Sequence, residues 1–177
     1  MRDYFSGFMI LLEEQYKLND VITIGDATGV VEHMTMRTTV LRDLEGRAHF
    51  IPNGQITHVT NRTHDWSQAL FNIRISYKED VDRVMDILIE LAKELQHDPE
   101  YSSAVIGEPR MLGVDDLDES AIVIKFIMKT QPKKMWPVRR EMLRRIKNRF
   151  DELGIKIPVP RRIAIEQQED DKGGKQK

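Results

Sequence analysis

The sequence predicts an α+β protein in which a strand-rich segment is followed by a segment of alternating strands and helices. Apolar residues recur at helical spacing in residues 1–16. Val- and Thr-rich runs separated by tight turns follow to residue 67, and strand and helix patterns then alternate to residue 160. With 177 residues, the chain is long enough for one large domain or two small ones. Its 32% charged and 40% hydrophobic residues are typical of a folded soluble protein.

The composition also argues against several classes of function. The formal net charge of -2 provides no overall attraction to nucleic acid or to an anionic membrane. Because the chain has no cysteine, disulfides and thiolate metal sites are excluded. The longest apolar run, residues 8–12, is far shorter than the roughly 18–20 residues of a membrane-spanning helix, and no signal-peptide pattern is present. We therefore expect this chain by itself to be soluble.

Residues 1–19 are the first predicted unit, with an amphipathic helix over residues 1–16. A helix of this length is not stable alone in water, so its apolar stripe should be covered by a neighbouring element or by copies of the chain. Gly7 interrupts this helix at a cost of about 1 kcal/mol relative to Ala, which indicates either a helix bend or close packing against another helix. The predicted stripe consists of Phe5, Phe8, Met9, Leu12 and Tyr16.

Residues 20–67 are predicted to form a small β domain. Its first strand, residues 21–24, ends at a turn that contains Gly25. A long strand then runs to residue 41, with alternate residues facing the core. The residues expected to share this buried parity are Val30, Met34, Met36, Thr38 and Val40.

The second half of the β domain contains two further turns. Residues 42–46 form a hairpin connection to a strand at residues 48–51. Residues 52–54, Pro-Asn-Gly, form a turn because Pro restricts φ while Asn and Gly tolerate positive φ. Residues 56–61 supply a last strand. Several short strands at this spacing indicate a strongly bent sheet or a barrel.

Residues 68–160 alternate between strands and helices. The strands are expected at residues 71–77, 110–114 and 121–129. Asp80 is a suitable cap for a first helix, and Pro137 and Gly154 mark the start and end of a second. The first helix is expected to bury Val81, Val84, Leu88, Leu91 and Leu95, and the second to bury Met142, Leu143, Ile146, Phe150 and Leu153.

A proline-bounded connector leads from the second helix to a final strand, residues 161–166. The order strand–helix–strand–strand–helix–strand is that of a ferredoxin-like sandwich. The predicted fold class is therefore α+β: a small Sm-like β-barrel or β domain, a ferredoxin-like α/β sandwich and a C-terminal strand. Residues 167–177 are polar and charged, and we expect them to be disordered.

No residues in the chain form a recognisable catalytic or metal-binding pattern. Four histidines, at positions 33, 49, 58 and 64, fall in the strand-rich region, but none of them has the i, i+4 spacing of a helical zinc pair. Residues 115–119 are acidic but lack the glycine of a calcium loop, so they are expected to form a solvated hairpin loop. We expect no metal, no cofactor and no enzymatic activity.

The second helix of the α/β segment is strongly basic, which together with a small barrel leaves an alternative function open. Such a chain could be a stand-alone soluble module that binds RNA or a regulatory ligand. The strands, however, lack stacking aromatics flanked by basic residues, and the first helix of the segment is acidic. Pairing of the basic residues with neighbouring acids, or lining of a solvent passage, is the favoured interpretation, and no nucleic acid partner is expected.

Several motifs resemble those of the small-conductance mechanosensitive channel (MscS) family. Residues 5–16 are similar to the end of the pore-lining helix, and residues 41–54, with Arg-Asp, Gly and Ile-Pro-Asn-Gly, are similar to the β domain. Residues 113–114, 136–155 and the two prolines that follow resemble the C-terminal domain. The residues that carry the family motif, and for which the resemblance implies structural roles, are Gly7, Asp20, Gly25, Arg42, Asp43, Gly46, Pro52, Asn53, Gly54 and Trp66.

The resemblance has consequences for assembly, location and function. It implies a homoheptamer whose α/β domains form a water-filled cage below a bilayer, with residues 161–166 as a barrel strand at its floor. Its implied partners are copies of itself, the membrane through N-terminal helices that are not in this sequence, and permeating ions and small solutes. Full-length family members would open under membrane tension in the cell inner membrane, with this region cytoplasmic, and would release solutes in hypo-osmotic shock. The family usually has Gly before the residue equivalent to Asp20, where this chain has Asn19, which also accepts positive φ.

Overall fold

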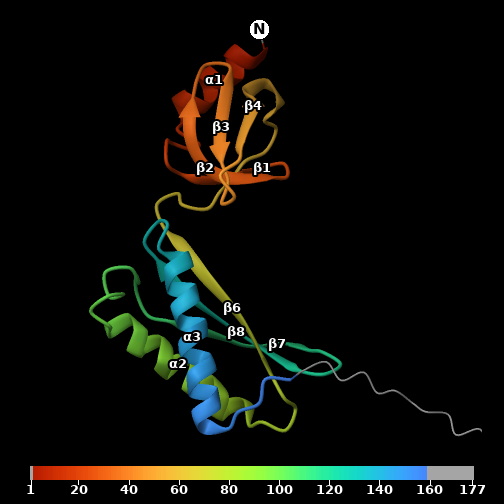
Figure 1. The fold of residues 1–177 in the computed structure, drawn as a ribbon, viewed down its shortest axis with the longest axis vertical. Helices are drawn as coiled ribbons and strands as arrows, with labels where there is room; N and C mark the ends of the chain where they lie inside the picture. The colour runs from red at the N-terminus through yellow and green to blue at the C-terminus, as the bar shows by residue number, and fades with distance from the viewer. Residues whose placement is uncertain (1, 159–177) are drawn as a thin grey trace, which may run out of the picture.

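The computed structural model describes residues 2–158 and has two parts joined by a short neck (Figure 1). One part contains the first helix and a bent five-stranded sheet, and the other contains a three-stranded sheet with two helices. No helix among these residues is long and apolar enough to cross a membrane. The mixed α+β character predicted from the sequence is confirmed. The predicted strand and tail at residues 161–177 lie outside the described residues.

The first helix, α1 (Arg2–Glu13), is shorter than the predicted helix over residues 1–16. It ends where Glu14 adopts a left-handed conformation with φ of 50°, so Tyr16 lies in the following loop rather than on the helix. Asn19 has φ of 70°, and its N–H donates to the carbonyl of Val31 at 2.8 Å. The expectation that Asn at this position accepts positive φ is therefore confirmed.

The β domain is an antiparallel sheet with the strand order β4-β3-β2-β1-β5. Gly25, with φ of 56°, lies in the two-residue turn between β1 and β2. The last predicted strand, residues 56–61, is wrong in extent because only two of its residues pair. The elements are β1 (Val21–Ile24), β2 (Ala27–Met34), β3 (Thr38–Arg42), β4 (Ala48–Pro52), a 3-10 turn η1 (Asn53–Gln55) and β5 (Thr60–Asn61).

The long strand predicted to run to residue 41 is wrong, because the chain turns back between β2 and β3. The hydroxyl of Thr35 accepts the backbone N–H groups of Arg37 and Thr38, at 3.2 and 3.0 Å, and this closes the turn. A register shift between Val31 and His33 then changes which parity faces inward. As a result Val31 is fully buried, whereas Val30, predicted to be in the core, is 36% exposed.

The second part has the strand order β6-β8-β7, all antiparallel, with both helices on one face of the sheet (Figure 1). This is the order of a ferredoxin-like sheet without its fourth strand, which would fall on residues outside the described range. The predicted loop at residues 115–119 is partly wrong, because β7 extends to Leu117 and carries the first acidic residues on the strand. The elements are β6 (Ser67–Ile75), α2 (Val81–His97), β7 (Arg110–Leu117), β8 (Ile122–Thr130) and α3 (Met135–Leu153).

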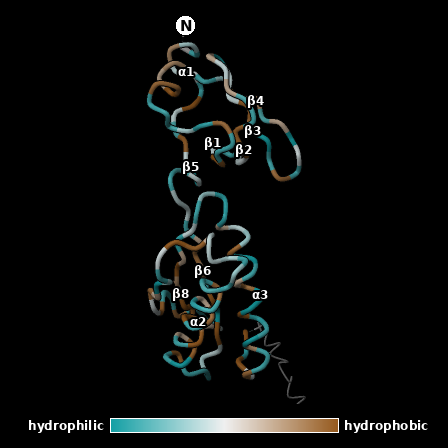
Figure 2. The backbone as a smooth tube through the Cα atoms, turned by 90° about the vertical axis from the view of Figure 1, so that its left-hand side faces the viewer, coloured by the Kyte–Doolittle hydropathy of each residue, from teal (hydrophilic) through white to brown (hydrophobic). Residues whose placement is uncertain are grey.

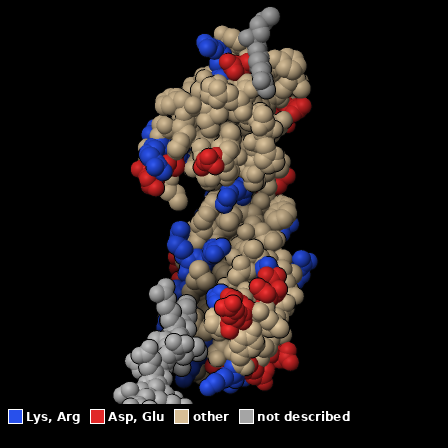
Figure 3. Space-filling view, turned by 90° about the vertical axis from the view of Figure 1, so that its right-hand side faces the viewer, with Lys and Arg blue, Asp and Glu red and all other residues tan. Residues whose placement is uncertain are grey.

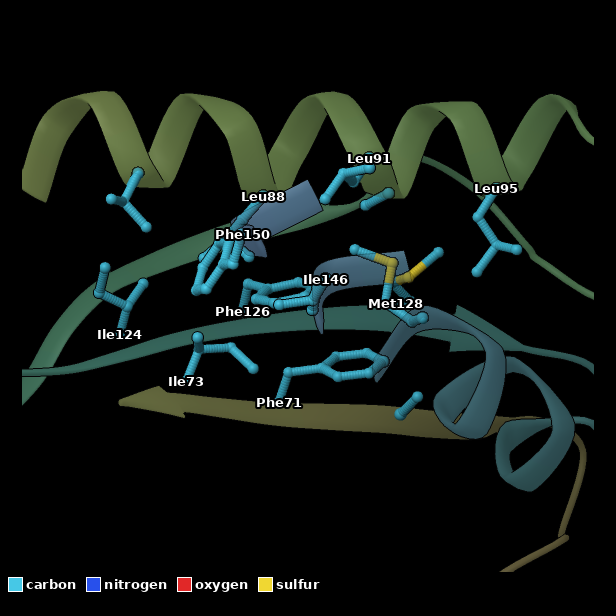
Figure 4. Close-up of a cluster of buried hydrophobic side chains, with 14 of the residues drawn as sticks. Phe71, Ile73, Leu88, Leu91, Leu95, Ile124, Phe126, Met128, Ile146 and Phe150 are labelled. Atoms are coloured by element: carbon cyan, nitrogen blue, oxygen red, sulfur yellow. The ribbon is translucent and has the colours of Figure 1, made fainter. Parts of the chain in front are cut away.

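The main hydrophobic core lies between this sheet and its helices (Figure 4). Phe71 of β6 stacks on Phe126 of β8, with ring centroids 4.5 Å apart and planes 7° apart. The predicted buried stripe of α2 is confirmed except that Val81 is only partly buried. In α3, the predictions for Leu143 and Leu153 are wrong, because these side chains are 40% and 41% exposed.

The helix-end signals are also resolved. The Asp80 side chain accepts from the backbone N–H of Arg83 at 3.1 Å and caps α2 as predicted. Gly154 ends α3 in a left-handed conformation with φ of 68°, also as predicted. Pro137 is the third residue of α3 and so lies in its first turn, as predicted. The start of α3 lacks a side-chain cap, since Lys134 occupies that position.

Candidate functional site: the joint between α1 and the β domain

The helix α1 packs closely against the β domain. Gly7 faces the turn between β2 and β3, and a Cβ added at Gly7 would lie 2.1 Å from the Met36 carbonyl oxygen and 2.5 Å from Asn53 Nδ2. No side chain fits at such distances, so the helix can approach this closely only because residue 7 has none. Ile10, one turn further along, is 6% exposed and belongs to the apolar core of the β domain.

Asn53 lies against the helix and is only 2% exposed, and both its amide nitrogen and its amide oxygen form a hydrogen bond. Its Nδ2 donates to the carbonyl of Thr35 at 2.9 Å, and its Oδ1 accepts from the hydroxyl of Thr39 at 2.9 Å. Since the single hydroxyl proton of Thr39 is committed to Asn53, the hydroxyl of Tyr16 must donate to Thr39 Oγ1, at 2.9 Å. Burial raises the pKa of Tyr16, which keeps this donor protonated.

A charged contact holds the beginning of α1. Asp3 Oδ1 accepts from the backbone N–H of Gly54 at 2.9 Å, so a carboxylate of the helix satisfies a main-chain donor of the β domain. The guanidinium of Arg37 lies 5.6 Å from the centre of the Tyr4 ring, a second contact to the same turn. Together with Gly7 and Asn53, these residues define the joint.

The outward face of α1 is apolar. Phe5, Phe8 and Leu12, which the sequence predicts to belong to a stripe covered by a neighbouring element or by copies of the chain, are 69%, 51% and 64% exposed. Within one chain, the stripe therefore points away from the β domain, and a different face, with Gly7 and Ile10, makes the intramolecular contact. Figure 2 shows hydrophobic stretches of α1 at the N-terminal end of the molecule.

The structure brings together only some of the motif residues predicted from the sequence. At the joint, Gly7 meets Asn53 and Gly54. These two residues directly follow Pro52, the last residue of β4. A helix bend at Gly7 stays a prediction. The alternative of close packing at Gly7 gains support, but the helix packs on the β domain rather than on another helix. Sequence reasoning gave Asp3 and Thr39 no role in attaching the helix. An acidic residue in the first turn of α1 was the only available signal, because their partners are about 50 and 14 residues away.

A second group of motif residues lies in the loop between β3 and β4. Arg42 Nε donates to Glu32 at 2.9 Å, and Gly46 adopts φ of 83°, which favours glycine. His49 and Arg47 both donate to the Asp43 carboxylate, so they hold its pKa well below the ordinary range.

The remaining motif residues lie at the end of the β domain nearest the neck. Asp20 accepts from Asn61 Nδ2 at 2.9 Å and ties β5 to the loop after α1. Trp66 precedes β6, and the ammonium of Lys129 lies 4.4 Å from the centre of its ring. Asp20 and Trp66 thus make contacts at the two ends of the short neck between the two parts and do not belong to the joint at α1.

The described residues contain no group of three or more side chains that could hold a metal ion. The basic side chains of α3 partly pair with acids, as favoured above: Arg145 contacts Asp98, at the end of α2, and Glu141. The Arg144 and Arg145 guanidiniums lower the pKa of Glu141 to about 2. Figure 3 shows basic and acidic side chains interspersed on one face of this part.

Comparison with known proteins identifies the family. Residues 1–64 match the mechanosensitive ion channel β-domain, and residues 69–157 match the C-terminal domain of MscS. The chain belongs to the MscS family of mechanosensitive ion channels. It is 37% identical over 165 residues to a small-conductance mechanosensitive channel of Caldanaerobacter subterraneus subsp. tengcongensis, covering 93% of this chain and 57% of that protein.

Other MscS relatives extend the comparison. A moderate-conductance mechanosensitive channel of Escherichia coli is 31% identical over 159 residues, which are 90% of this chain and 22% of that protein. The closed-state crystal structure of Helicobacter pylori MscS shares the fold with a TM-score of 0.75 at 21% identity, covering 94% of this chain and 66% of that one. Arabidopsis thaliana MSL1 aligns with a TM-score of 0.62 at 17% identity, over 90% and 58%. The chain thus spans little more than half the length of the first of these MscS relatives.

Proposed function

We propose that this chain is the cytoplasmic vestibule portion of a mechanosensitive channel that opens under membrane tension and releases small solutes in hypo-osmotic shock. The proposal rests on the joint between α1 and the β domain, together with the membership of this chain in the MscS family. A helix with an apolar outer face is fastened to a β domain through Gly7, Asp3 and Asn53. Such a joint can transmit movement of a pore-lining helix to the domain beneath it.

The exposed stripe of α1 supports self-association. Phe5, Phe8 and Leu12 present a continuous apolar face of the kind that monomeric soluble proteins rarely leave uncovered. Identical copies arranged around an axis would cover it, since each copy supplies the same helix. We infer a homoheptamer in the cell inner membrane, attached through N-terminal helices, with ions and small solutes passing through its cytoplasmic part.

A test of the function uses the full-length channel that contains this chain. It should protect bacteria lacking their own mechanosensitive channels against hypo-osmotic downshift, and membrane patches should show pressure-activated currents. Asp3→Ala, which removes the acceptor for the Gly54 N–H, should change the pressure threshold or the decay of the current. The matched control Asp82→Ala, on the exposed face of α2, should leave both unchanged. Membrane-inserted protein without pressure-activated current would contradict the proposal.

Assembly is tested separately. Light scattering on the 20.7 kDa chain at high concentration should detect masses above that of the monomer. Phe8→Ser should reduce this association, because it places a hydroxyl on the apolar stripe. A strict monomer over the whole concentration range would count against self-association through this region.

A further inference from the structure

The loop between β3 and β4, residues 43–47, is a rigid arm. The Asp43 carboxylate accepts from the backbone N–H groups of Glu45 and Arg47, at 3.0 and 2.9 Å, from Arg47 Nε at 2.8 Å and from His49 Nε2 at 2.9 Å. Arg42 Nη1 donates to the Gly46 carbonyl at 2.9 Å. One carboxylate thus organises the whole loop, so its conformation needs no further ordering when it meets a partner.

The arm presents one apolar side chain at its tip. Leu44 is 106% exposed, the most exposed of the large hydrophobic residues in the described range. Figure 2 shows the arm standing off from the side of the β domain beyond β3 and β4, and Figure 3 shows it with charged side chains around it and a hollow beneath. The exposed Leu44 side chain contributes no hydrophobic stabilisation within its own chain. Burying it against another surface would be favourable.

The same domain carries a groove where its sheet fails to close into a barrel. The sheet ends at β4, whose outer edge pairs with no other strand of residues 2–158, and the groove lies between this edge, the β1–β2 turn and residues 55–60. Its volume is about 620 Å³. Phe50, which is 72% exposed, stands at its wall. The lining includes Ile24, Asp26, Phe50, Ile51, Thr57 and His58.

We propose that the arm of one copy inserts Leu44 into this groove of the next copy. The inference rests on the self-association proposed above and names the residues that make it. Leu44 does not line the groove of its own chain, so the groove must receive the arm of another copy. Each copy has one arm and one groove, so every arm in an assembly of copies has a groove available. Because they are different surfaces of one domain, their contact is head-to-tail, and repeated contacts of this type form a ring where the rotation from copy to copy closes.

The chemistry of the two surfaces favours a second copy as the occupant. Glu45 and Arg47 pair with each other at 3.2 Å, so the arm carries no strong charge of one sign. The groove likewise mixes apolar walls with Asp26 and two histidines. A charged peptide or an anionic lipid surface would find no complementary charge at this groove, whereas an apolar tip with a polar rim matches it.

The absence of cysteine allows a clean crosslinking test. In the double variant Leu44→Cys with Thr57→Cys, mild oxidation should produce a ladder of disulfide-linked multimers on non-reducing gels. Neither single variant should form the ladder. A dimer formed equally well by Leu44→Cys alone would show a symmetric contact and overturn the proposal, as would the absence of a ladder in the double variant.

A second measurement uses association itself. Leu44→Ala should weaken self-association measured by sedimentation at least about tenfold, because it removes most of the inserted apolar side chain. The control Leu117→Ala changes a 65% exposed leucine at the far end of the α/β part and should have no effect. Equal losses in both variants would overturn the proposal. Intact wild-type oligomers with no ladder and no effect of Leu44→Ala would refute this contact while leaving the proposed channel function standing.

Discussion

Gly7→Ala provides the sharpest test of the joint between α1 and the β domain. On helix propensity alone, this change should stabilise α1 by about 1 kcal/mol. The structure predicts the opposite, because the new Cβ would lie 2.1 Å from the Met36 carbonyl oxygen and 2.7 Å from its carbonyl carbon. These are main-chain atoms that cannot rotate away, and the third neighbour, Asn53, is buried with both of its amide atoms hydrogen-bonded.

The helix must therefore lift or the turn must shift. Overpacking of this kind costs about 1–3 kcal/mol. Lifting the helix would also weaken the bond from Gly54 to Asp3, worth about 1.5–3 kcal/mol for a charged acceptor. With that bond lost and the gain in helix propensity of about 1 kcal/mol subtracted, we expect the attachment of α1 to lose about 1.5–5 kcal/mol.

The assay is amide hydrogen exchange of α1 together with urea unfolding. Gly7→Ala should accelerate exchange along α1 while exchange in α2 and α3 stays unchanged. Ser6→Ala, a neighbouring change on the same half-buried turn, is the matched control and should leave α1 protected. If Gly7→Ala instead slowed exchange and raised stability, the close approach would be refuted and a bend at Gly7 would be the better explanation.

Two further predictions concern the α/β part. The depressed pKa of Glu141, about 2, means that its ion pairs stabilise the fold above its ordinary pKa of 4.5 and lose this contribution as the pH falls from about 4.5 towards 2. Urea unfolding should show Glu141→Gln to be less stable than the parent by about 1 kcal/mol at pH 7, with the difference vanishing near pH 2; a constant difference would contradict the ion-pair explanation. Phe126→Ala should lower the free energy of unfolding by about 3–5 kcal/mol, because it removes a fully buried ring stacked on Phe71. Leu117→Ala should change it by less than about 0.5 kcal/mol, and equal effects of the two changes would contradict the observed core.

The helices of the α/β part illustrate what periodicity can predict. In α2, the spacing of Val84, Leu88, Leu91 and Leu95 identified the buried face, because a long helix repeats the same signal several times. In α3, the same reasoning was wrong for Leu143 and Leu153. The face of α3 that packs on the core is the i, i+4 row of Val138, Met142, Ile146 and Phe150, and neither Leu143 nor Leu153 belongs to this row.

The β domain was harder to predict, because short strands provide few repeats. A single polar residue, Thr35, turns the chain by accepting backbone N–H groups, and a bulge near Val31 reverses the parity that the sequence pattern indicated. The turn and the bulge each involve only a few neighbouring residues. Neither changes the composition of this Val-, Thr- and Met-rich segment, so the sequence pattern did not indicate them.

The sequence by itself determined the fold class, the α2 stripe and its Asp80 cap, and the family motifs, because these depend on spacing along the chain. Only the tertiary structure decided which face of α1 packs inward, and it brought Asp3, Gly7 and Asn53 into one joint. The physical reason is that a helix with apolar residues around most of its circumference has several possible inner faces. The choice among them is made by the shape and the hydrogen-bonding groups of the surface that receives it, and these come from residues more than 25 positions away.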